Sequence, residues 1–240
     1  MLGPPAVRLR AQDLPIFPDP QGADDTGLVA VSHDLTPALL LAASRQGIFP
    51  WTDDPVGWFS PNPRALVLRQ HLHLPRNLGK LARRGGLRAT YDRAFVDVMR
   101  GCAQAHRHAG VWITPRFIAA YSALHLAGWA HSVEIWHEDR LVGGLYGVQA
   151  APGLFAGESM FSQVPNASKL AFAALWSELD RRGIDWMDAQ VVNPHTERLG
   201  ARPQPRSAFL QRVRAAVAAD PHLVPPGTWA TEPQSAHPPI

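Results

Sequence analysis

The chain has little of several residue types, and each shortage excludes a class of protein. Cys102 is the only cysteine among 240 residues, so no internal disulfide can form and a reducing compartment is expected. Apolar runs such as Ala38–Ala43 are far too short to cross a bilayer. Met1–Arg10 has no apolar centre, so we expect no signal peptide, no membrane association and a cytoplasmic protein.

Motifs that hold cofactors are also missing from the sequence. The 11 histidines show no metal-ligand spacing, and there is neither a phosphate-binding Walker loop nor a dinucleotide fingerprint. We therefore expect no cofactor and no metal. Cys102 lies in a stretch with helical apolar spacing, which favours a core thiol over a nucleophile.

Lysine is scarce as well, because Lys80 and Lys169 are the only two and the remaining basic residues are arginines. A net charge of +3 points only weakly to an anionic partner. The distribution says more, since one short segment gathers five basic residues: Arg76, Lys80, Arg83, Arg84 and Arg88. Such a cluster attracts phosphates irrespective of nucleotide sequence. A solvated basic face is the structural alternative.

The most informative segment is Phe155–Ser162, which places the carboxylate of Glu158 among apolar and small residues. A buried carboxylate is costly unless a cation pairs with it. That cation is either one of the protein's own side chains, as in an internal ion pair, or part of a substrate.

A second set of polar residues lies towards the end of the mostly apolar segment Ile184–Val192, which is predicted to be a strand. Side chains alternate along a strand, so Asp188 and Gln190 are expected on one face, and Ala189 on the other. Asn193–Thr196 follows directly. The cluster predicts a site at the carboxyl end of this strand, with a polar rim at the solvent boundary as the alternative.

The order of elements predicts an α+β protein. A helix over Pro37–Arg45, capped by Thr36, precedes a Trp- and Pro-rich loop, and residues 1–64 are expected to form a small amino-terminal domain. Residues 65–240 are expected to form the larger domain. Its predicted elements are helices over Arg93–Ala105 and from Thr114 to Gly128, a hairpin of His131–Trp136 with Leu141–Val148, a strand over Leu154–Phe161, a helix over Ala167–Arg182 and the strand Ile184–Val192. This order is compatible with an acyltransferase domain of the N-acetyltransferase type.

Six blocks, taken together and in order, resemble the bacterial leucyl/phenylalanyl-tRNA–protein transferases. They are Gly47–Trp51, Trp58–Arg64, Trp112–Thr114, His131–Val148, Gly157–Lys169 and Asp188–Gly200. The resemblance covers the chain from about Leu28 to Leu210. It implies an N-acetyltransferase-like larger domain and transfer of Leu or Phe from charged tRNA to proteins with an amino-terminal Arg or Lys, which creates a degradation signal. The aminoacyl ester is already activated, so the resemblance also implies that no cofactor is consumed.

The resemblance carries expected roles to particular positions. It places Asp188 and Gln190 at the catalytic centre, Glu158 and Asn193 at the acceptor, and Trp51 and Trp112 at the terminal adenosine of the tRNA. The expected aminoacyl pocket comprises Leu145, Phe155, Met160 and Leu175. The expected contacts to the tRNA backbone are Arg76, Lys80, Arg83 and Arg84. For each apolar or aromatic position the ordinary alternative is plain core, which we expect for Trp176 and Trp186. A monomer is expected.

Elementary chemistry limits what these groups do. An α-amine has an intrinsic pKa near 7.7–8.0, so a useful fraction is already neutral and positioning matters more than a strong base. The amide of Gln190 is too weak a base to take the proton outright, but its oxygen can accept a hydrogen bond from the amine. We expect Asp188 to orient Gln190 and Gln190 to position the amine, with a ribose hydroxyl of the tRNA as a possible proton shuttle.

Some positions depart from the family pattern. Ser44 stands where the family usually has a tyrosine, Ala189 where it has a cysteine, and Pro194 where it has an aspartate. We expect the change at 189 to be neutral, because that side chain should face away from the catalytic side.

Two rival functions are an acetyl-coenzyme-A-dependent N-acetyltransferase and a non-catalytic RNA-binding module. The first needs a pyrophosphate-binding loop, and the nearest candidate, Arg83–Arg88, ends in an arginine where a small residue belongs.

Overall fold

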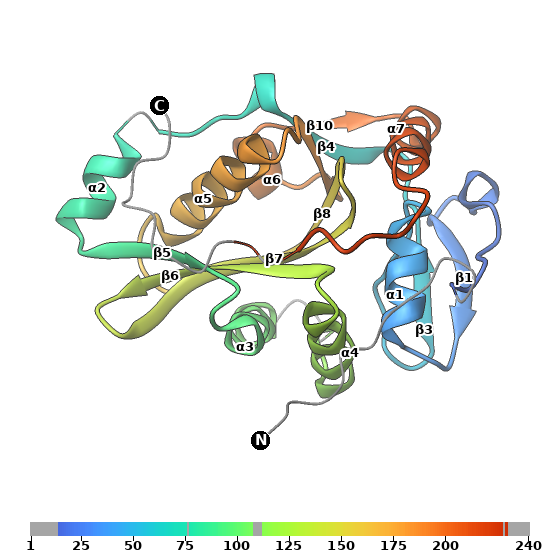
Figure 1. The fold of residues 1–240 in the computed structure, drawn as a ribbon, viewed down its shortest axis with the longest axis horizontal. Coiled ribbons are helices and arrows are strands. Elements are labelled where there is room, and N and C mark those ends of the chain that lie inside the picture. Colours follow the sequence, from blue (N-terminus) through green and yellow to red (C-terminus); the bar gives the residue numbers. More distant parts are fainter. Residues whose placement is uncertain (1–13, 76, 108–111, 228, 230–240) are drawn as a thin grey trace.

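Two β-sheets of unequal size organise the chain. The computed structural model describes residues 14–75, 77–107, 112–227 and 229 (Figure 1). The small antiparallel sheet has the order β1-β3-β2. The large sheet has the order β10-β4-β9-β8-β7-β6-β5. The small sheet comprises β1 (Leu28–Ser32), β2 (Phe49–Pro50) and β3 (Val56–Phe59).

The amino-terminal helix α1 (Pro37–Ser44) forms where its caps predict. The Thr36 hydroxyl accepts a hydrogen bond from the Leu39 N–H, and Pro37 occupies the first helical turn. Gly47 follows with a φ of +73°, and a Cβ there would meet Phe209 and Leu210 of α7 (Arg206–Ala218) at 2.7 Å. Glycine at 47 therefore permits both the left-handed turn and the close approach of the small sheet to α7.

The large sheet holds the predicted hairpin and crossover. Its strands are β4 (Arg64–Leu68), β5 (Leu87–Tyr91), β6 (Ala130–His137), β7 (Arg140–Ala151), β8 (Leu154–Ser162), β9 (Trp186–Gln190) and β10 (Ala201–Gln204). The pairs β6–β7 and β7–β8 are antiparallel, and α5 (Ala167–Arg181) connects β8 to the parallel strand β9. The predicted hairpin, third strand, crossover helix and final strand are thereby confirmed, with ends shifted by up to three residues.

The pairing of β8 with β9 is short, and this leaves room for a site. Strands β8 and β9 pair at a single register position, Ala156 opposite Asp188. Beyond that position no further ladder joins them, so the carboxyl end of β9 and the second half of β8 separate. The mixed sheet therefore contains an opening between two of its central strands.

Helices cover both faces of the large sheet (Figure 1). On one face lie α3 (Phe95–His106) and α4 (Pro115–Leu126), and on the other lies α5, against which α2 (Leu78–Arg84) packs. Short segments complete the described elements: α6 (Pro194–Arg198) and the 3-10 turns Pro20–Gly22 and Arg69–His71. Thr114 caps α4 as predicted, and Gly128 follows that helix with a φ of +82°.

Apolar residues form two clusters, one on each face of the large sheet. Cys102 is a fully buried free thiol in the cluster under α3, and Trp176 and Trp186 are buried core residues, all as predicted. None of the described helices is long and apolar enough to cross a membrane. Arg64, which the predicted boundary assigns to the amino-terminal region, is the first residue of β4 in the large sheet. The division at 64/65 stays a prediction.

Candidate active site

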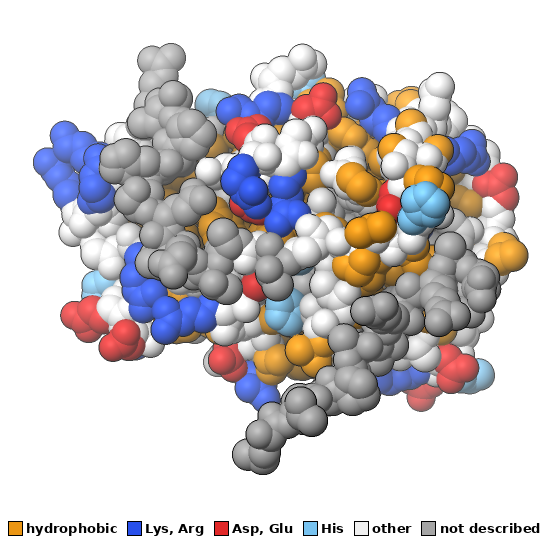
Figure 2. Space-filling model, viewed as in Figure 1, with side chains coloured by type: hydrophobic (Ala, Val, Ile, Leu, Met, Phe, Trp, Pro, Cys, Tyr) orange, Lys and Arg blue, Asp and Glu red, His pale blue; other side chains and the backbone are white. Residues whose placement is uncertain are grey.

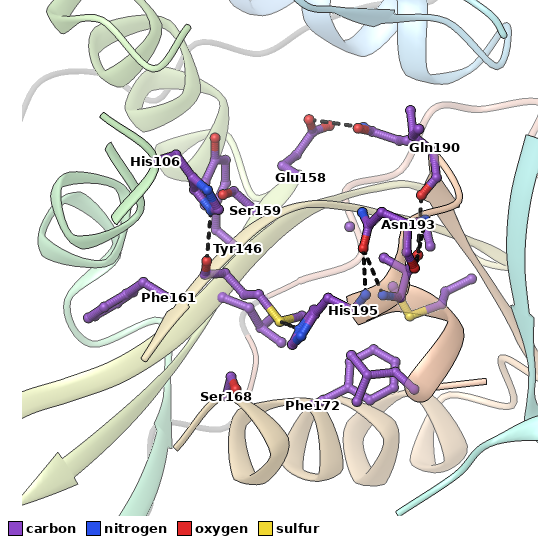
Figure 3. A pocket seen from close by; sticks show the side chains of 18 of the residues that line it. His106, Tyr146, Glu158, Ser159, Phe161, Ser168, Phe172, Gln190, Asn193 and His195 are labelled. Atoms are coloured by element: carbon purple, nitrogen blue, oxygen red, sulfur yellow. Dashed lines mark hydrogen bonds between the residues drawn. The ribbon is translucent and has the colours of Figure 1, made fainter. Parts of the chain in front are cut away.

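A cavity of about 580 Å³ opens between the separated ends of β8 and β9. Its wall is built from both strands, the end of α3, the first half of α5, α6 and the segment Phe49–Trp51 of the small sheet (Figure 3). The lining is mainly apolar, with a few polar side chains directed inward. This composition is typical of a pocket for an organic ligand.

Glu158 from β8 is the carboxylate of this cavity. Its Oε2 accepts a hydrogen bond from Nε2 of Gln190 at 3.1 Å (Figure 3), and the Tyr121 hydroxyl of α4 also bonds to it. Burial raises the pKa of Glu158 from 4.5 to about 7, an effect that the nearby Asp188 increases and that Gln190, Tyr121 and Arg64 oppose. Among the described residues no basic side chain forms an ion pair with Glu158. The internal ion pair that was the structural alternative is therefore not found there.

Gln190 closes β9 with an unusual backbone. Its φ is +61°, a conformation that non-glycine residues adopt rarely, and its N–H donates to Oδ1 of Asp188 at 2.8 Å. The side chain of Gln190 lines the cavity, whereas that of Asp188 does not. Asp188 therefore contacts Gln190 through the backbone rather than through its amide.

The side chain of Ala189 does not lie where we expected. We expected its side chain to face away from the site, yet Ala189 lines the cavity together with Met187. The reason is that the cavity passes through the gap beside β9 and reaches both faces of that strand. Alternation along the strand thus does not separate site residues from core residues here. A change from cysteine to alanine at 189 alters the cavity wall.

Arg64 is the partner of Asp188, and sequence reasoning missed it. Its Nε and Nη2 donate to the two carboxylate oxygens at 2.8 and 2.6 Å, with Arg64 only 1% and Asp188 only 2% exposed. The guanidinium lies over the ring of Phe49, at 4.7 Å, and over that of Phe209, at 4.5 Å. An arginine that opens the apolar segment Ala65–Leu68 was the available signal, because an arginine that enters a core needs a carboxylate.

Two tryptophans reach the cavity from different parts of the chain. Trp51 lies between β2 and β3 and is 42% exposed, and Trp112 precedes α4 and is half-buried. Each is held by one or two aromatic neighbours, Trp51 by Phe49 and Phe59, and Trp112 by Phe117. Both therefore present ring surface to the cavity on a fixed support.

The predicted aminoacyl residues are brought together with one exception. Leu145, Met160 and Leu175 line the cavity. Phe155 does not; it is fully buried behind the wall, 5.5 Å from Trp229 between ring centroids. Further apolar residues that the sequence did not single out also line the cavity, among them Phe172 and Met187. Phe172 lies one helical turn before Leu175 on α5, so helical spacing was the signal for it.

Polar residues around Met160 complete the wall. Asn193 caps α6, because its Oδ1 accepts from the N–H groups of His195 and Thr196 at 2.9 and 3.0 Å. This cap occupies the oxygen and leaves the amide nitrogen for a ligand. His195 lies with Nε2 2.9 Å from Sδ of Met160, and His106 lies 3.1 Å from the Met160 carbonyl. Burial lowers the pKa of His195, so its imidazole is neutral near pH 7.

Tyr146 contributes a hydroxyl without a partner. The residue lines the cavity and is fully buried, and within the described residues its hydroxyl makes no hydrogen bond. Burial raises the pKa of this phenol well above 10, so it remains a proton donor. A buried hydroxyl with no partner is rare, and one in a cavity wall indicates a contact completed by a ligand.

The predicted basic cluster is displayed on α2. Lys80, Arg83 and Arg84 are exposed, and Figure 2 shows Lys and Arg side chains gathered at the edge of the molecule over this helix. Arg76 lies outside the described residues. No residue of α2 lines the cavity, but α2 packs against α5, and three residues of α5 do line it. Across the described chain, no group of three His, Cys, Asp or Glu side chains could hold a metal ion.

Comparison with known proteins gives a consistent match. The family described as leucyl/phenylalanyl-tRNA protein transferase matches residues 66–214, and its amino-terminal domain matches residues 33–62. A leucyl/phenylalanyl-tRNA–protein transferase of Pectobacterium carotovorum is 50% identical over 201 residues, which are 82% of this chain and 85% of the relative. The corresponding protein of Magnetococcus marinus is 44% identical over 234 residues, or 95% and 97% of the two chains.

Solved structures are more distant. A GCN5-related N-acetyltransferase from Kribbella flavida aligns with a TM-score of 0.37 and 14% identity, over 70% of this chain and 61% of that one. A likeness at this score does not define the fold. The mixed α+β architecture is established by the strands and helices themselves.

Proposed function

The chain belongs to the leucyl/phenylalanyl-tRNA–protein transferase family, and we propose that it moves Leu or Phe from charged tRNA to the α-amine of proteins that begin with Arg or Lys. One observation carries the acceptor side of this proposal. Glu158 is a largely buried carboxylate in the cavity with no ion-pair partner among the described side chains. A basic side chain at the start of an acceptor supplies the missing cation, and its arrival lowers the pKa of Glu158.

The reaction forms one amide bond and breaks one ester bond. The neutral α-amine attacks the ester carbonyl, the nitrogen loses a proton, and the terminal ribose oxygen of the tRNA takes up a proton as it leaves. Gln190 commits its amide nitrogen to Glu158, which leaves its oxygen to accept a hydrogen bond from the amine. Gln190 thus orients the lone pair towards the carbonyl, and this positioning is the main catalytic contribution.

Asp188 has a supporting task. Both of its oxygens are occupied, by Arg64 and by the Gln190 N–H, so it does not reach the amine itself. Asp188 instead holds Gln190, the residue that contacts the amine. The proton of the amine passes to the ribose oxygen, either directly or through the neighbouring ribose hydroxyl, without a protein base of high pKa.

The donor occupies the rest of the cavity. Trp51 and Trp112 contact the terminal adenine, and such stacking contributes about 1–3 kcal/mol per base. Leu145, Met160 and Leu175 surround the Leu or Phe side chain, with Phe172 and Met187 beside them. Methionine is unbranched and polarizable, which suits a pocket that accepts two shapes. The cationic side chains of α2, Lys80, Arg83 and Arg84, contact the phosphates of the tRNA body, and Arg76 is proposed to join them.

One assay tests the donor and acceptor rules together. The purified protein is incubated with tRNA charged with labelled leucine and with peptides that begin with Arg or with Ala, without acetyl-coenzyme A. We expect label on the Arg peptide only. Label on neither peptide, also with Phe-tRNA as donor, contradicts the proposal, and retained tRNA binding would then favour the RNA-binding module. Label that requires acetyl-coenzyme A and appears as acetyl groups would favour the N-acetyltransferase.

A further inference from the structure

We propose that Arg64 is a positioning residue for the transfer reaction and that it acts on Gln190 through Asp188. The inference rests on the proposed function, because it concerns how the amide that orients the acceptor amine is held. Arg64 itself does not line the cavity. Its effect has to pass through the atoms it contacts.

The first step is that Arg64 has almost no freedom. Its Nε and Nη2 bond to the two oxygens of Asp188 at 2.8 and 2.6 Å, in the paired geometry that a planar guanidinium matches to a carboxylate. Cζ of Arg64 also lies over the rings of Phe49 and Phe209, at 4.7 and 4.5 Å from their centroids. Three separate parts of the chain therefore fix one cation: β2 of the small sheet, β9 and α7.

The second step is that the fixed cation fixes Asp188. The carboxylate is buried, and removal of its cationic partner would leave a buried charge uncompensated, which is strongly destabilising. Two hydrogen bonds from one planar group determine the position and rotation of the carboxylate. A lysine at 64 would keep the charge but would present a single ammonium, so this rotation would no longer be fixed.

The third step links Asp188 to the site. Its Oδ1 accepts the Gln190 N–H at 2.8 Å, and the backbone of Gln190 is left-handed with a φ of +61°. A non-glycine residue keeps this conformation only where its surroundings impose it. A return to extended backbone would redirect the side chain of Gln190, and the 3.1 Å bond from its amide to Glu158 would be lost. Arg64, Asp188, Gln190 and Glu158 thus form one connected chain of contacts.

The relationship has a clear kinetic signature. The contacts proposed for the acceptor cation and the adenine belong to Glu158 and the two tryptophans. These side chains keep supports that do not involve Arg64: Tyr121 for Glu158, Phe59 for Trp51 and Phe117 for Trp112. A change at Arg64 should therefore lower kcat while the KM values for acceptor and charged tRNA stay nearly constant. A residue that only supports folding would lower the melting temperature without lowering the turnover of the folded enzyme.

The test compares Arg64→Lys with Arg45→Lys in the full chain. Arg45 is a matched control, because it is 10% exposed, pairs with Asp220 at 2.9 Å and lies outside the cavity wall. Turnover is measured per folded molecule, well below the melting temperature. For Arg64→Lys we expect kcat to fall about 10- to 100-fold, the loss expected from a small misplacement, and both KM values to change less than about twofold. Arg45→Lys should keep the wild-type kcat.

A second measurement asks whether Gln190 is the target. In the Gln190→Ala background, Arg64→Lys should lower kcat by less than about twofold, because the group that it positions is already gone. If Arg64→Lys does not fold, Phe209→Leu removes one of the two ring contacts of Arg64 from outside the cavity, and the same pattern is expected with a smaller loss.

Three results would overturn the inference: an Arg64→Lys enzyme with wild-type kcat, a loss that appears in KM, or equal losses with and without Gln190. These outcomes are distinct from failure of the proposed function. Wild-type protein that transfers no amino acid contradicts the function, whereas an active wild type with an unaffected Arg64→Lys variant contradicts only the role of Arg64.

Discussion

The side-chain amide of Gln190 donates to the carboxylate of Glu158 across 3.1 Å, and this bond bridges two strands that have just separated. The two residues are 32 positions apart in the chain, on β8 and β9. Each follows, by two residues, the only paired position of these strands, Ala156 opposite Asp188. The carboxylate proposed to bind the acceptor and the amide proposed to orient its amine are thereby held in one hydrogen-bonded unit.

Replacement of Glu158 by glutamine should weaken the choice of acceptor. The variant keeps the shape and a hydrogen-bond acceptor but loses the negative charge that pairs with the basic side chain. We expect the ratio of kcat/KM for Arg-started over Ala-started peptides to fall at least tenfold, which corresponds to about 1.4 kcal/mol. The exposed Glu197→Gln on α6 serves as control. An unchanged ratio in Glu158→Gln would assign this carboxylate a structural role only.

The pH dependence of stability should report the raised pKa of Glu158. Burial raises that pKa from 4.5 to about 7, so between these values the folded state binds a proton that the unfolded state has released. The proton difference makes stability fall as pH rises through this range, and the penalty is complete above pH 7. Glu158→Gln removes the penalty. Its melting temperature should exceed that of the wild type clearly at pH 8 and much less at pH 5; an equal difference at both values would contradict the shift.

Truncation of Trp51 should impair donor binding rather than chemistry. The side chain is 42% exposed, so Trp51→Ala should cost the fold little. The loss of stacking on adenine, about 1–3 kcal/mol, predicts a KM for charged tRNA raised roughly 5- to 150-fold, with kcat nearly unchanged. Trp51→Phe keeps a ring and should stay close to wild type. A variant of Trp51 that lowers kcat alone would argue against the adenine contact.

Neutralisation of α2 should change the salt dependence of tRNA binding. With Lys80, Arg83 and Arg84 all replaced by glutamine, the slope of log affinity against log salt concentration should fall by about 2 to 3, since each phosphate contact contributes about 0.7–0.9. Transfer from a short aminoacylated CCA fragment should be unaffected, because α2 does not line the cavity. An unchanged slope would leave these side chains as a solvated face.

Removal of the Tyr146 hydroxyl should not harm the fold. This hydroxyl has no partner among the described residues, so Tyr146→Phe should leave the free energy of unfolding unchanged or slightly higher. Tyr91→Phe is the control, because the Tyr91 hydroxyl donates to the Ala174 carbonyl at 2.9 Å and its loss should cost about 0.5–1.5 kcal/mol. Thermal denaturation of both variants decides the matter. Equal destabilisation would show that Tyr146 has a structural partner.

Local patterns along the chain account for much of the fold. Thr36 and Thr114 mark helix starts because their hydroxyls accept the N–H groups of the first turn, and both caps are found. The hairpin of β6 and β7 and the crossover through α5 follow from short-range periodicity and turn residues. The ends of elements differ by up to three residues, because terminal turns and strand ends depend on tertiary contacts.

The sequence by itself determined the family, the element order and the presence of a carboxylate in an apolar segment, since these depend on residue types and spacing along the chain. Tertiary structure alone decided what Asp188 contacts, because Arg64 is 124 residues distant and no local pattern pairs them. It also decided that Ala189 lines the cavity and Phe155 does not. Those placements depend on where β8 and β9 separate, and this gap is produced by the packing of the whole sheet rather than by the alternation of any single strand.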